Sequence, residues 1–230
     1  MISIVIPCYN ENKFLEQILT KVNSIKDLEK EVILIDDGSN SQTKKIIDDC
    51  VERKLIDKLI TLNKNCGKGF ALKEGIQKAE GEIILFQDSD MEYDPDDYKK
   101  LIKPILDNKA DVVYGSRFTS NEKGQRVLYF THRLANFLLT SLTNIFTNIN
   151  FSDMETGYKV FKSSIIKDID LKEKSFGIEP EITLKLAKKK VKFYEVGISY
   201  NGRTYEEGKK IMLKDFFIAI YCIFKYRFFN

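Results

Sequence analysis

Two acidic side chains, Asp88 and Asp90, directly follow the apolar run Ile83-Ile84-Leu85-Phe86, which is typical of a buried β-strand. Carboxylates spaced by two residues can chelate one hard divalent cation, and that cation can hold a diphosphate. Glu92 could add a third oxygen ligand. These residues predict a Mg²⁺ or Mn²⁺ site, and the structural alternative is a solvated acidic loop before the next helix.

Polar residues also follow two earlier strand-like segments, which end in Pro7-Cys8-Tyr9-Asn10-Glu11 and in Asp36-Asp37-Gly38-Ser39. For Asp36 and Asp37 the ordinary interpretation is an Asx turn, with Ser39 or Asn40 capping the next helix. The segment Gly67-Lys68-Gly69 lacks the spacing of a P-loop, and Leu72 stands where a dinucleotide fingerprint needs its third glycine. Alone it predicts a helix entry that needs small residues.

The elements that position these residues alternate between strands and helices. Short apolar runs predict strands at 2–7, 31–35, 58–62, 82–86 and 111–114. Phe14, Ile18, Val22 and Ile25 recur at helical spacing between the first two strands, and Asp94-Pro95 is a helix start. A helix at 178–190 and a strand near 191–200 follow. This order predicts a doubly wound α/β fold, whose ligands bind at the carboxyl ends of the strands.

Composition narrows the class of protein. The 230 residues are 43% hydrophobic and 31% charged, which argues against disorder and collagen-like repeats. With 37 basic and 34 acidic side chains, the chain lacks the positive excess of a nucleic-acid-binding protein. Four dispersed cysteines and one histidine disfavour structural zinc and a disulfide framework, so we expect a reducing, cytoplasmic compartment. We also expect no signal peptide and no membrane-spanning segment.

Positive charge gathers at the end of the chain. Positions 203–230 hold six basic and three acidic side chains beside seven aromatic ones from Phe216 onward, a composition typical of an in-plane membrane anchor. Positions 134–152 contain no charged residue, and 127–152 carry an apolar stripe with Asn and Thr opposite. This pattern predicts a pair of interfacial helices for the acceptor, and a core or dimer helix is the alternative.

Taken in order, these motifs resemble those of the family 2 inverting glycosyltransferases of GT-A fold. The resemblance extends through Asp111-Val-Val-Tyr-Gly115-Ser116-Arg117 and Asp153-x-x-Thr156-Gly157-Tyr158-Lys159. Glu179-Pro180-Glu181 and Gly202-Arg203-Thr204-x-x-x-Gly208-Lys209-Lys210-Ile211 are similar to the polyprenyl-phosphate branch, which includes dolichyl-phosphate mannose synthases. The resemblance covers about residues 2–213. It implies a GT-A domain at 1–205 and a basic, aromatic membrane-associating segment at 206–230.

The resemblance also implies roles for particular residues. The divalent metal would be held by Asp88 and Asp90, and Glu92 departs from the family, which usually has Gln there. Arg117 and Arg133 would meet the acceptor phosphate, and Arg203 with Lys209 or Lys210 would close over the donor. The remaining donor-binding residues would be Pro7, Tyr9, Glu11, Asp36, Asp37, Lys68 and Ser89.

The predicted function is metal-dependent, inverting transfer of a hexose from GDP-mannose or, second, UDP-glucose to a polyprenyl phosphate. It would take place at the cytosolic face of a membrane, with room for a membrane-bound partner subunit and no role for nucleic acid. A phosphate acceptor is already anionic near neutral pH, so no general base is required. One alternative uses a saccharide hydroxyl, with Asp153 or Glu155 as base. Two others are a sugar-phosphate nucleotidyltransferase and a non-catalytic membrane-binding module.

Overall fold

One mixed sheet organises the protein. The computed structural model describes residues 1–119, 126, 129–204, 206–208 and 213–229. Within them a seven-stranded sheet has the order β3-β2-β1-β4-β6-β5-β7. The strands are β1 (Ile2–Cys8), β2 (Lys30–Asp36), β3 (Lys58–Thr61), β4 (Ile83–Phe86), β5 (Val112–Ser116), β6 (Lys159–Lys162) and β7 (Phe193–Gly197).

Strand direction follows the predicted pattern except at β6. β1 pairs in parallel with β2 and β4, and β2 with β3. β6 runs antiparallel to both of its neighbours, β4 and β5, and β5 pairs in parallel with β7. The five strands predicted in the first half are confirmed within one or two residues. β6 was not predicted as a strand, because only its preceding motif, beginning at Asp153, was recognised.

Helices cover both faces of the sheet. One face packs against α1 (Leu15–Ser24), α2 (Ser41–Glu52) and α4 (Tyr98–Leu106), and the other against α3 (Lys68–Lys78), α6 (Ser163–Lys167) and α7 (Ile178–Lys188). The predicted start signals are confirmed. Asn40 caps α2 by accepting a hydrogen bond from Thr43 N, and Asp94 caps the short 3₁₀ helix η1 (Pro95–Asp97).

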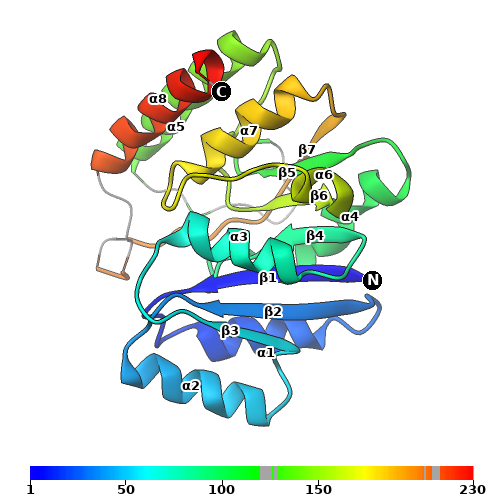
Figure 1. Cartoon of the computed structure of the whole chain (residues 1–230), viewed down its shortest axis with the longest axis vertical. Helices are drawn as coiled ribbons and strands as arrows, with labels where there is room; N and C mark the ends of the chain where they lie inside the picture. The colour runs from blue at the N-terminus through cyan, green and yellow to red at the C-terminus, as the bar shows by residue number, and fades with distance from the viewer. Residues whose placement is uncertain (120–125, 127–128, 205, 209–212, 230) are drawn as a thin grey trace.

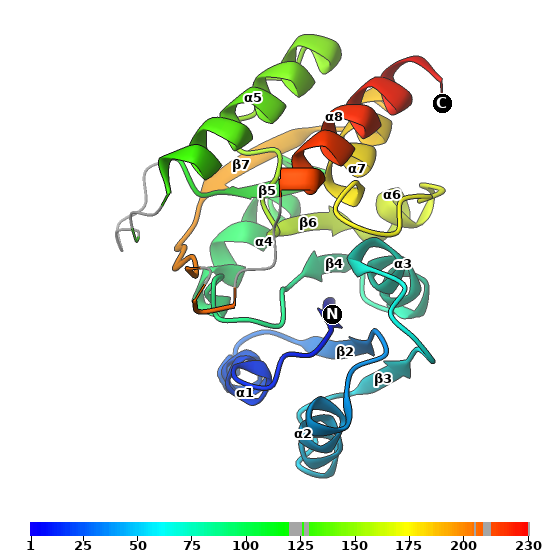
Figure 2. The same ribbon diagram turned by 90° about the vertical axis from the view of Figure 1, so that its left-hand side faces the viewer.

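An outer layer lies over α7. It consists of α5 (Phe130–Thr147) and α8 (Leu213–Phe228), which run side by side with α7 between them and the sheet (Figures 1 and 2). Seven buried residues fill the space beneath them: Leu139, Met154, Leu184, Ala219, Cys222, Ile223 and Tyr226. Among the described residues, no helix has both the length and the apolar character needed to cross a bilayer.

The prediction of two helices within 127–152 is wrong. α5 is a single helix, which ends at Asn148 in the left-handed conformation at φ 55°, a geometry that asparagine tolerates. Its polar face is the buried one, with Asn136, Thr140 and Thr143 directed inward. Five of its apolar side chains are exposed, while Leu139 is buried: the exposed ones are Phe130, Leu134, Phe137, Leu138 and Ile145. Val127, part of the predicted stripe, lies outside the described residues.

Candidate active site

Three acidic residues gather after β4, and cations from distant parts of the chain contact them. Asp88 Oδ1 lies 2.8 Å from the Nζ of Lys68, the first residue of α3. Asp90 forms a short ion pair with Arg203. Glu92 accepts a hydrogen bond from the backbone N of Arg203 at 2.9 Å. The structure therefore brings together Lys68, Arg203 and all three predicted acids.

Arg203 connects the ends of two strands. Its guanidinium contacts Asp90 and Glu92 after β4, and its Nη1 lies 3.1 Å from Glu11 Oε2 in the loop after β1. The Arg203 side chain is only 13% exposed. Arg203, which was predicted to close over the donor, thus lies across the ends of β1 and β4, where the donor is predicted to bind. Lys209 and Lys210, its predicted companions, lie outside the described residues.

The charge at this end favours a divalent cation. Burial and the negative charges of Asp88 and Glu92 raise the pKa of Asp90 to about 7. Carboxylate oxygens are the ligands that Mg²⁺ and Mn²⁺ prefer, so Asp88 and Asp90 fit such an ion. Glu92 is engaged instead with Arg203 and with Tyr200 Oη, which donates to it at 2.9 Å. In the described part of the chain, no three His, Cys, Asp or Glu side chains are arranged to hold one metal ion.

Asp36 and Asp37 are buried and bonded to backbone groups. Asp36 Oδ1 accepts from Ser39 N, three residues on, at 2.9 Å, so the side chain closes a local turn that is one residue longer than the predicted Asx turn. Asp37 accepts from Cys66 N at 2.6 Å and from Gly67 N at 2.8 Å, which fixes the loop that leads to Lys68. Their predicted nucleotide contacts stay a prediction, since this arrangement already uses these carboxylates to shape the site.

The other predicted donor residues lie at the same edge. Tyr9 is 40% exposed, Pro7 is half-buried and Glu11 is 5% exposed. The adjacent Asn10 joins the first two strand-end loops, because its Oδ1 accepts from Asn40 N at 2.8 Å. Ser89, between the two acids, is half-buried. The exposed ring of Tyr9 is the surface on which a nucleotide base could stack.

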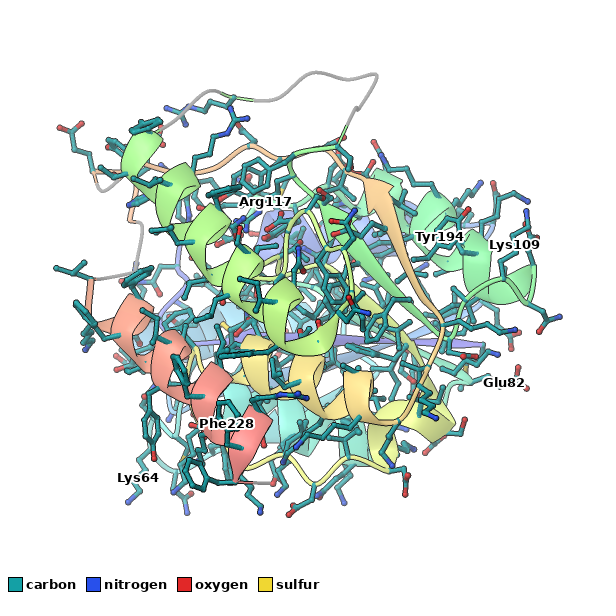
Figure 3. All side chains as sticks on the ribbon, turned by 90° about the horizontal axis from the view of Figure 1, so that it is seen from above. Lys64, Glu82, Lys109, Arg117, Tyr194 and Phe228 are labelled. Carbon is teal, nitrogen blue, oxygen red and sulfur yellow. The ribbon has the colours of Figure 1, made fainter. Side chains whose placement is uncertain are left out.

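The predicted acceptor residues lie on one aromatic ring. Arg117 and Arg133 approach the ring of Phe118, at 5.6 and 5.7 Å from its centroid. Figure 3 labels Arg117 beside α5. Arg117 is also held by Asp153, which accepts from its Nε and Nη2 at 2.7 Å each, and this pairing places the pKa of Arg117 well above its usual range. Asn136 of α5 accepts from Arg117 Nη2 at 3.4 Å.

Tyr200 connects the predicted acceptor residues with the predicted donor residues. Its ring lies 5.2 Å from the guanidinium carbon of Arg117, and its hydroxyl donates to Glu92. A bridge between the backbones of Tyr93 and Tyr200 holds this segment against the loop after β4. Sequence reasoning assigned Tyr200 no role. Its signal was position, three residues beyond the end of β7 and three before Arg203.

Two further acids face the site from its interior. Glu179, the second residue of α7, is 6% exposed, and its Oε1 lies 3.3 Å from Lys68 Nζ. Glu155 belongs to the segment that precedes β6, and burial and the charge of Glu179 raise its pKa to about 8. Sequence reasoning gave Glu179 no role and treated Glu155 only as a base for another reaction.

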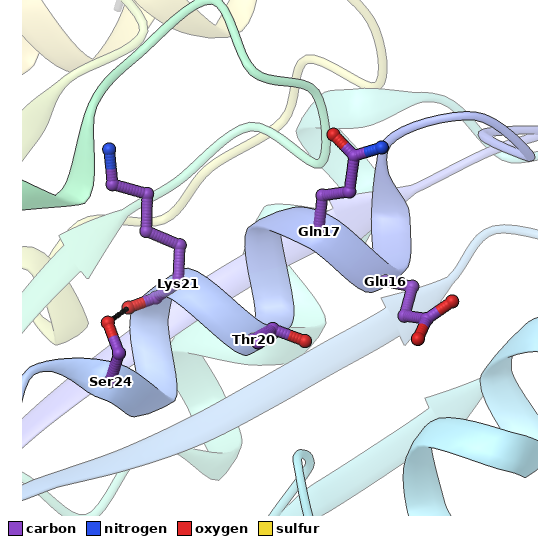
Figure 4. Close-up of a pocket in the computed structure, with 5 residues that line it drawn as sticks. All are labelled: Glu16, Gln17, Thr20, Lys21 and Ser24. Carbon is purple, nitrogen blue, oxygen red and sulfur yellow. Dashed lines mark hydrogen bonds between the residues drawn. The ribbon is translucent and has the colours of Figure 1, made fainter.

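The depression drawn in Figure 4 lies elsewhere. It is formed by one face of α1 and contains no predicted site residue; its lining is Glu16, Gln17, Thr20, Lys21 and Ser24. The candidate reactive site is therefore the cluster at the strand ends, where acids, arginines and Lys68 converge.

Known proteins resemble this chain along most of its length. The family model described as "Glycosyl transferase family 2" matches residues 3–170. Dolichol-phosphate mannosyltransferase of Pyrococcus furiosus is 25% identical over 214 residues, which cover 91% of this chain and 60% of that protein. The UDP-N-acetylglucosamine-dolichyl-phosphate N-acetylglucosaminyltransferase of Methanococcus voltae is 27% identical over 233 residues, 93% of this chain and 91% of that one.

A solved structure shares the fold. Glucosyl-3-phosphoglycerate synthase from Mycobacterium tuberculosis, crystallised with Mn²⁺, UDP and glucosyl-3-phosphoglycerate, superposes with a TM-score of 0.74 at 18% identity. The superposition covers 98% of this chain and 79% of that one. The mixed sheet with helices on both faces is therefore the architecture of a GT-A protein.

Proposed function

We propose that this chain, which belongs to glycosyl transferase family 2, transfers a hexose from a nucleotide sugar to a polyprenyl phosphate. Two relatives are named as transferases to dolichol or dolichyl phosphate, one of mannose and the other of N-acetylglucosamine. The observation that carries the proposal is the pair Arg117 and Arg133, which meets at Phe118 beside a helix with an exposed apolar face. GDP-mannose is the first donor that we propose, and UDP-glucose the second.

At the donor end, Asp88 and Asp90 would hold Mg²⁺ or Mn²⁺. When bound, such an ion neutralises the negative charge that develops on the departing diphosphate. Lys68 and Arg203, which now contact the acids, lie where they can exchange a carboxylate for a phosphate oxygen of the donor. Glu92 would keep the Arg203 segment in place through the backbone N of that residue.

At the acceptor end, a phosphate monoester has a second pKa of about 6 and is an anionic nucleophile near neutral pH. Its oxygen forms the new bond to the anomeric carbon, while the bond to the diphosphate breaks and the nucleoside diphosphate leaves with the electron pair. No proton has to be removed. The guanidinium groups of Arg117 and Arg133 would orient the phosphate, since this group pairs well with phosphate oxygens.

The competing hydroxyl-acceptor reaction needs a base, and Asp153 is poorly suited to be one. Its Oδ1 and Oδ2 both accept hydrogen bonds from Arg117, at 2.7 Å each. Both oxygens of this buried carboxylate are therefore already engaged by the guanidinium group. This argument supports a phosphate acceptor over a saccharide hydroxyl activated by Asp153.

We further propose peripheral attachment to the cytosolic face of a membrane. α5 and α8 expose large apolar side chains on one side of the molecule, and Figure 3 labels Phe228 on α8. Phe137 is 63% exposed and Phe217 61% exposed, while Lys225 and Arg227 lie in the last turn of α8. Apolar side chains beside basic ones suit an anionic lipid surface. A membrane-bound partner subunit would extend this attachment.

The test is release of nucleoside diphosphate from GDP-mannose, UDP-glucose and UDP-N-acetylglucosamine, each with and without Mg²⁺ or Mn²⁺. Each donor is assayed with a short polyprenyl phosphate, with a saccharide, and without acceptor. Release that requires both the metal and the lipid phosphate supports the proposal and identifies the donor. Release that is indifferent to the lipid phosphate, or that requires the saccharide, refutes it.

A further inference from the structure

Two carboxylates inside the site each have a buried oxygen without a partner. Oε1 of Glu155 and Oε2 of Glu179 are inaccessible to solvent and accept no hydrogen bond from the residues that the structure describes. A buried acceptor without a donor lowers stability, because it loses its water without replacement. Two such oxygens in one region indicate that a bound molecule supplies the missing donors.

The two acids lie between the donor end and the acceptor end. The other oxygen of Glu179 contacts Lys68, which contacts Asp88 in turn, so this carboxylate adjoins the proposed metal ligands. The charges that act on Glu155 include those of Glu179 and of Arg117, so Glu155 lies near both. In a transfer from diphosphate to phosphate, the sugar occupies the space between these two groups. Glu155 and Glu179 therefore border the position of the transferred sugar.

The backbone that carries these acids is held by neighbouring groups. Lys159, buried beneath the segment, donates to Met154 O at 2.9 Å and to Thr156 O, on either side of Glu155. Glu179 lies on the first turn of α7, which packs against the sheet, and its Oε1 contacts Lys68. The positions of both residues are thus set before any ligand arrives. Preorganised acceptors of this kind suit a ligand that has several hydroxyl donors at fixed spacing.

We propose that Glu155 and Glu179 form a sugar subsite, in which Oε1 of Glu155 and Oε2 of Glu179 accept hydrogen bonds from hydroxyl groups of the donor's hexose. This subsite rests on the proposed function, because it assumes a nucleotide-sugar donor at Asp88 and Asp90. It assigns the two acids to recognition of the sugar rather than to the nucleotide or the acceptor.

The experiment compares the affinity for a nucleotide sugar with that for its bare nucleoside diphosphate. GDP-mannose against GDP, and UDP-glucose against UDP, are titrated by calorimetry in the presence of Mg²⁺. Titrated at a pH above 8, where Glu155 is ionised, Glu155→Gln should lower the preference for the sugar-bearing ligand roughly tenfold, since a charge-assisted hydrogen bond becomes a neutral one. The affinity for the bare diphosphate should stay within about twofold, because Glu155 would contact only the sugar. Glu179→Gln should reduce the preference as well.

Glu181→Gln is the matched control. Glu181 lies on the same helix and is fully buried, but it accepts from Lys172 N at 2.8 Å and from Glu173 N at 2.7 Å. It should therefore keep the sugar preference, and thermal unfolding monitors the fold of all three variants. An unchanged preference in Glu155→Gln and Glu179→Gln overturns the subsite, as does an equal loss for sugar-bearing and bare ligands. Lost turnover with unchanged binding would assign Glu155 to proton transfer and also overturn it.

The wild-type protein separates this subsite from the proposed function. If it binds neither nucleoside diphosphate nor nucleotide sugar, the proposed function fails and the subsite fails with it. If it binds both and the two variants keep the wild-type preference, the subsite alone is refuted.

Discussion

Replacing Arg203 with glutamine should affect metal binding and turnover in opposite directions. In the absence of donor, Arg203 contacts Asp90, Glu92 and Glu11, and its side chain is only 13% exposed. A divalent cation that binds Asp90 must therefore displace this guanidinium. Arg203→Gln removes the competitor, so the affinity for Mn²⁺ in the absence of donor should rise.

The strength of the contact between Arg203 and Asp90 sets the size of the change in Mn²⁺ affinity. A hydrogen bond between charged groups contributes about 1.5–3 kcal/mol, and little solvent screening reduces it at this depth. Loss of one such contact corresponds to a roughly 10- to 100-fold gain in Mn²⁺ affinity. Turnover should fall by roughly 10²–10³, the usual effect of removing one group that stabilises developing negative charge.

Calorimetric titration with Mn²⁺ and single-turnover release of nucleoside diphosphate measure the two quantities. Arg126→Gln is the control, because Arg126 also contacts this segment, through Gly202 O and Glu207, but is 39% exposed and far less constrained. It should leave Mn²⁺ affinity within about twofold of wild type. A Mn²⁺ affinity in Arg203→Gln that is unchanged or weaker would refute the competition between Arg203 and the metal.

Three further predictions concern other parts of the site. Asp153→Asn leaves the buried Arg117 guanidinium without its counter-charge and should lower the free energy of unfolding by about 3–5 kcal/mol in urea titrations; lost turnover at unchanged stability would instead favour a base. Because the pKa of Asp90 is raised to about 7, its contribution to stability is full below pH 4 and is lost as pH rises toward 7. The free energy of unfolding of Asp90→Asn should therefore exceed that of wild type by roughly 1–3 kcal/mol at pH 8 and match it near pH 4. A constant difference across this range would contradict the raised pKa of Asp90. Phe137→Ser should weaken binding to anionic liposomes about tenfold, whereas Leu106→Ser, equally exposed at 63% on α4, should not; equal effects would remove α5 from the proposed membrane surface.

Local sequence signals predicted the first half of the fold well. Its strands are nearly continuous apolar runs, because both faces of the sheet are covered by helices, and this pattern is visible without tertiary information. The caps at Asn40 and Asp94 are equally local, since a side chain bonds a backbone group two or three residues away.

The outer layer was harder to predict because α5 departs from the usual rule and buries mostly polar residues. In α5 the polar Asn136 and Thr140 face inward, where they bond Arg117 and the backbone N of Met154. Several apolar residues, among them Phe137 and Leu138, face outward, whereas Leu139 is buried. A periodicity argument finds two faces on a helix but cannot tell which one is buried, since that depends on neighbours brought from elsewhere in the chain.

Site residues that follow a strand were predicted from the sequence, whereas the role of a residue that precedes a strand was missed. Asp88 and Asp90 follow β4, so the rule for parallel sheets found them. Glu155 precedes β6, which runs antiparallel to its neighbours and so begins at the edge where they end. Glu179 lies on a helix far along the chain, and its contact with Lys68 depends on tertiary packing that no local pattern encodes.

Helix α5 also joins two parts of the protein mechanically. Its 18 residues form one rod about 27 Å long, with the exposed Phe137 on one side and Asn136, next in sequence, bonded to Arg117 on the other. α5 is one continuous helix between the outer surface and Asn136, which contacts the arginine proposed to hold the acceptor. Any tilt or shift of this rod against a lipid surface would therefore be transmitted directly to the geometry of Arg117.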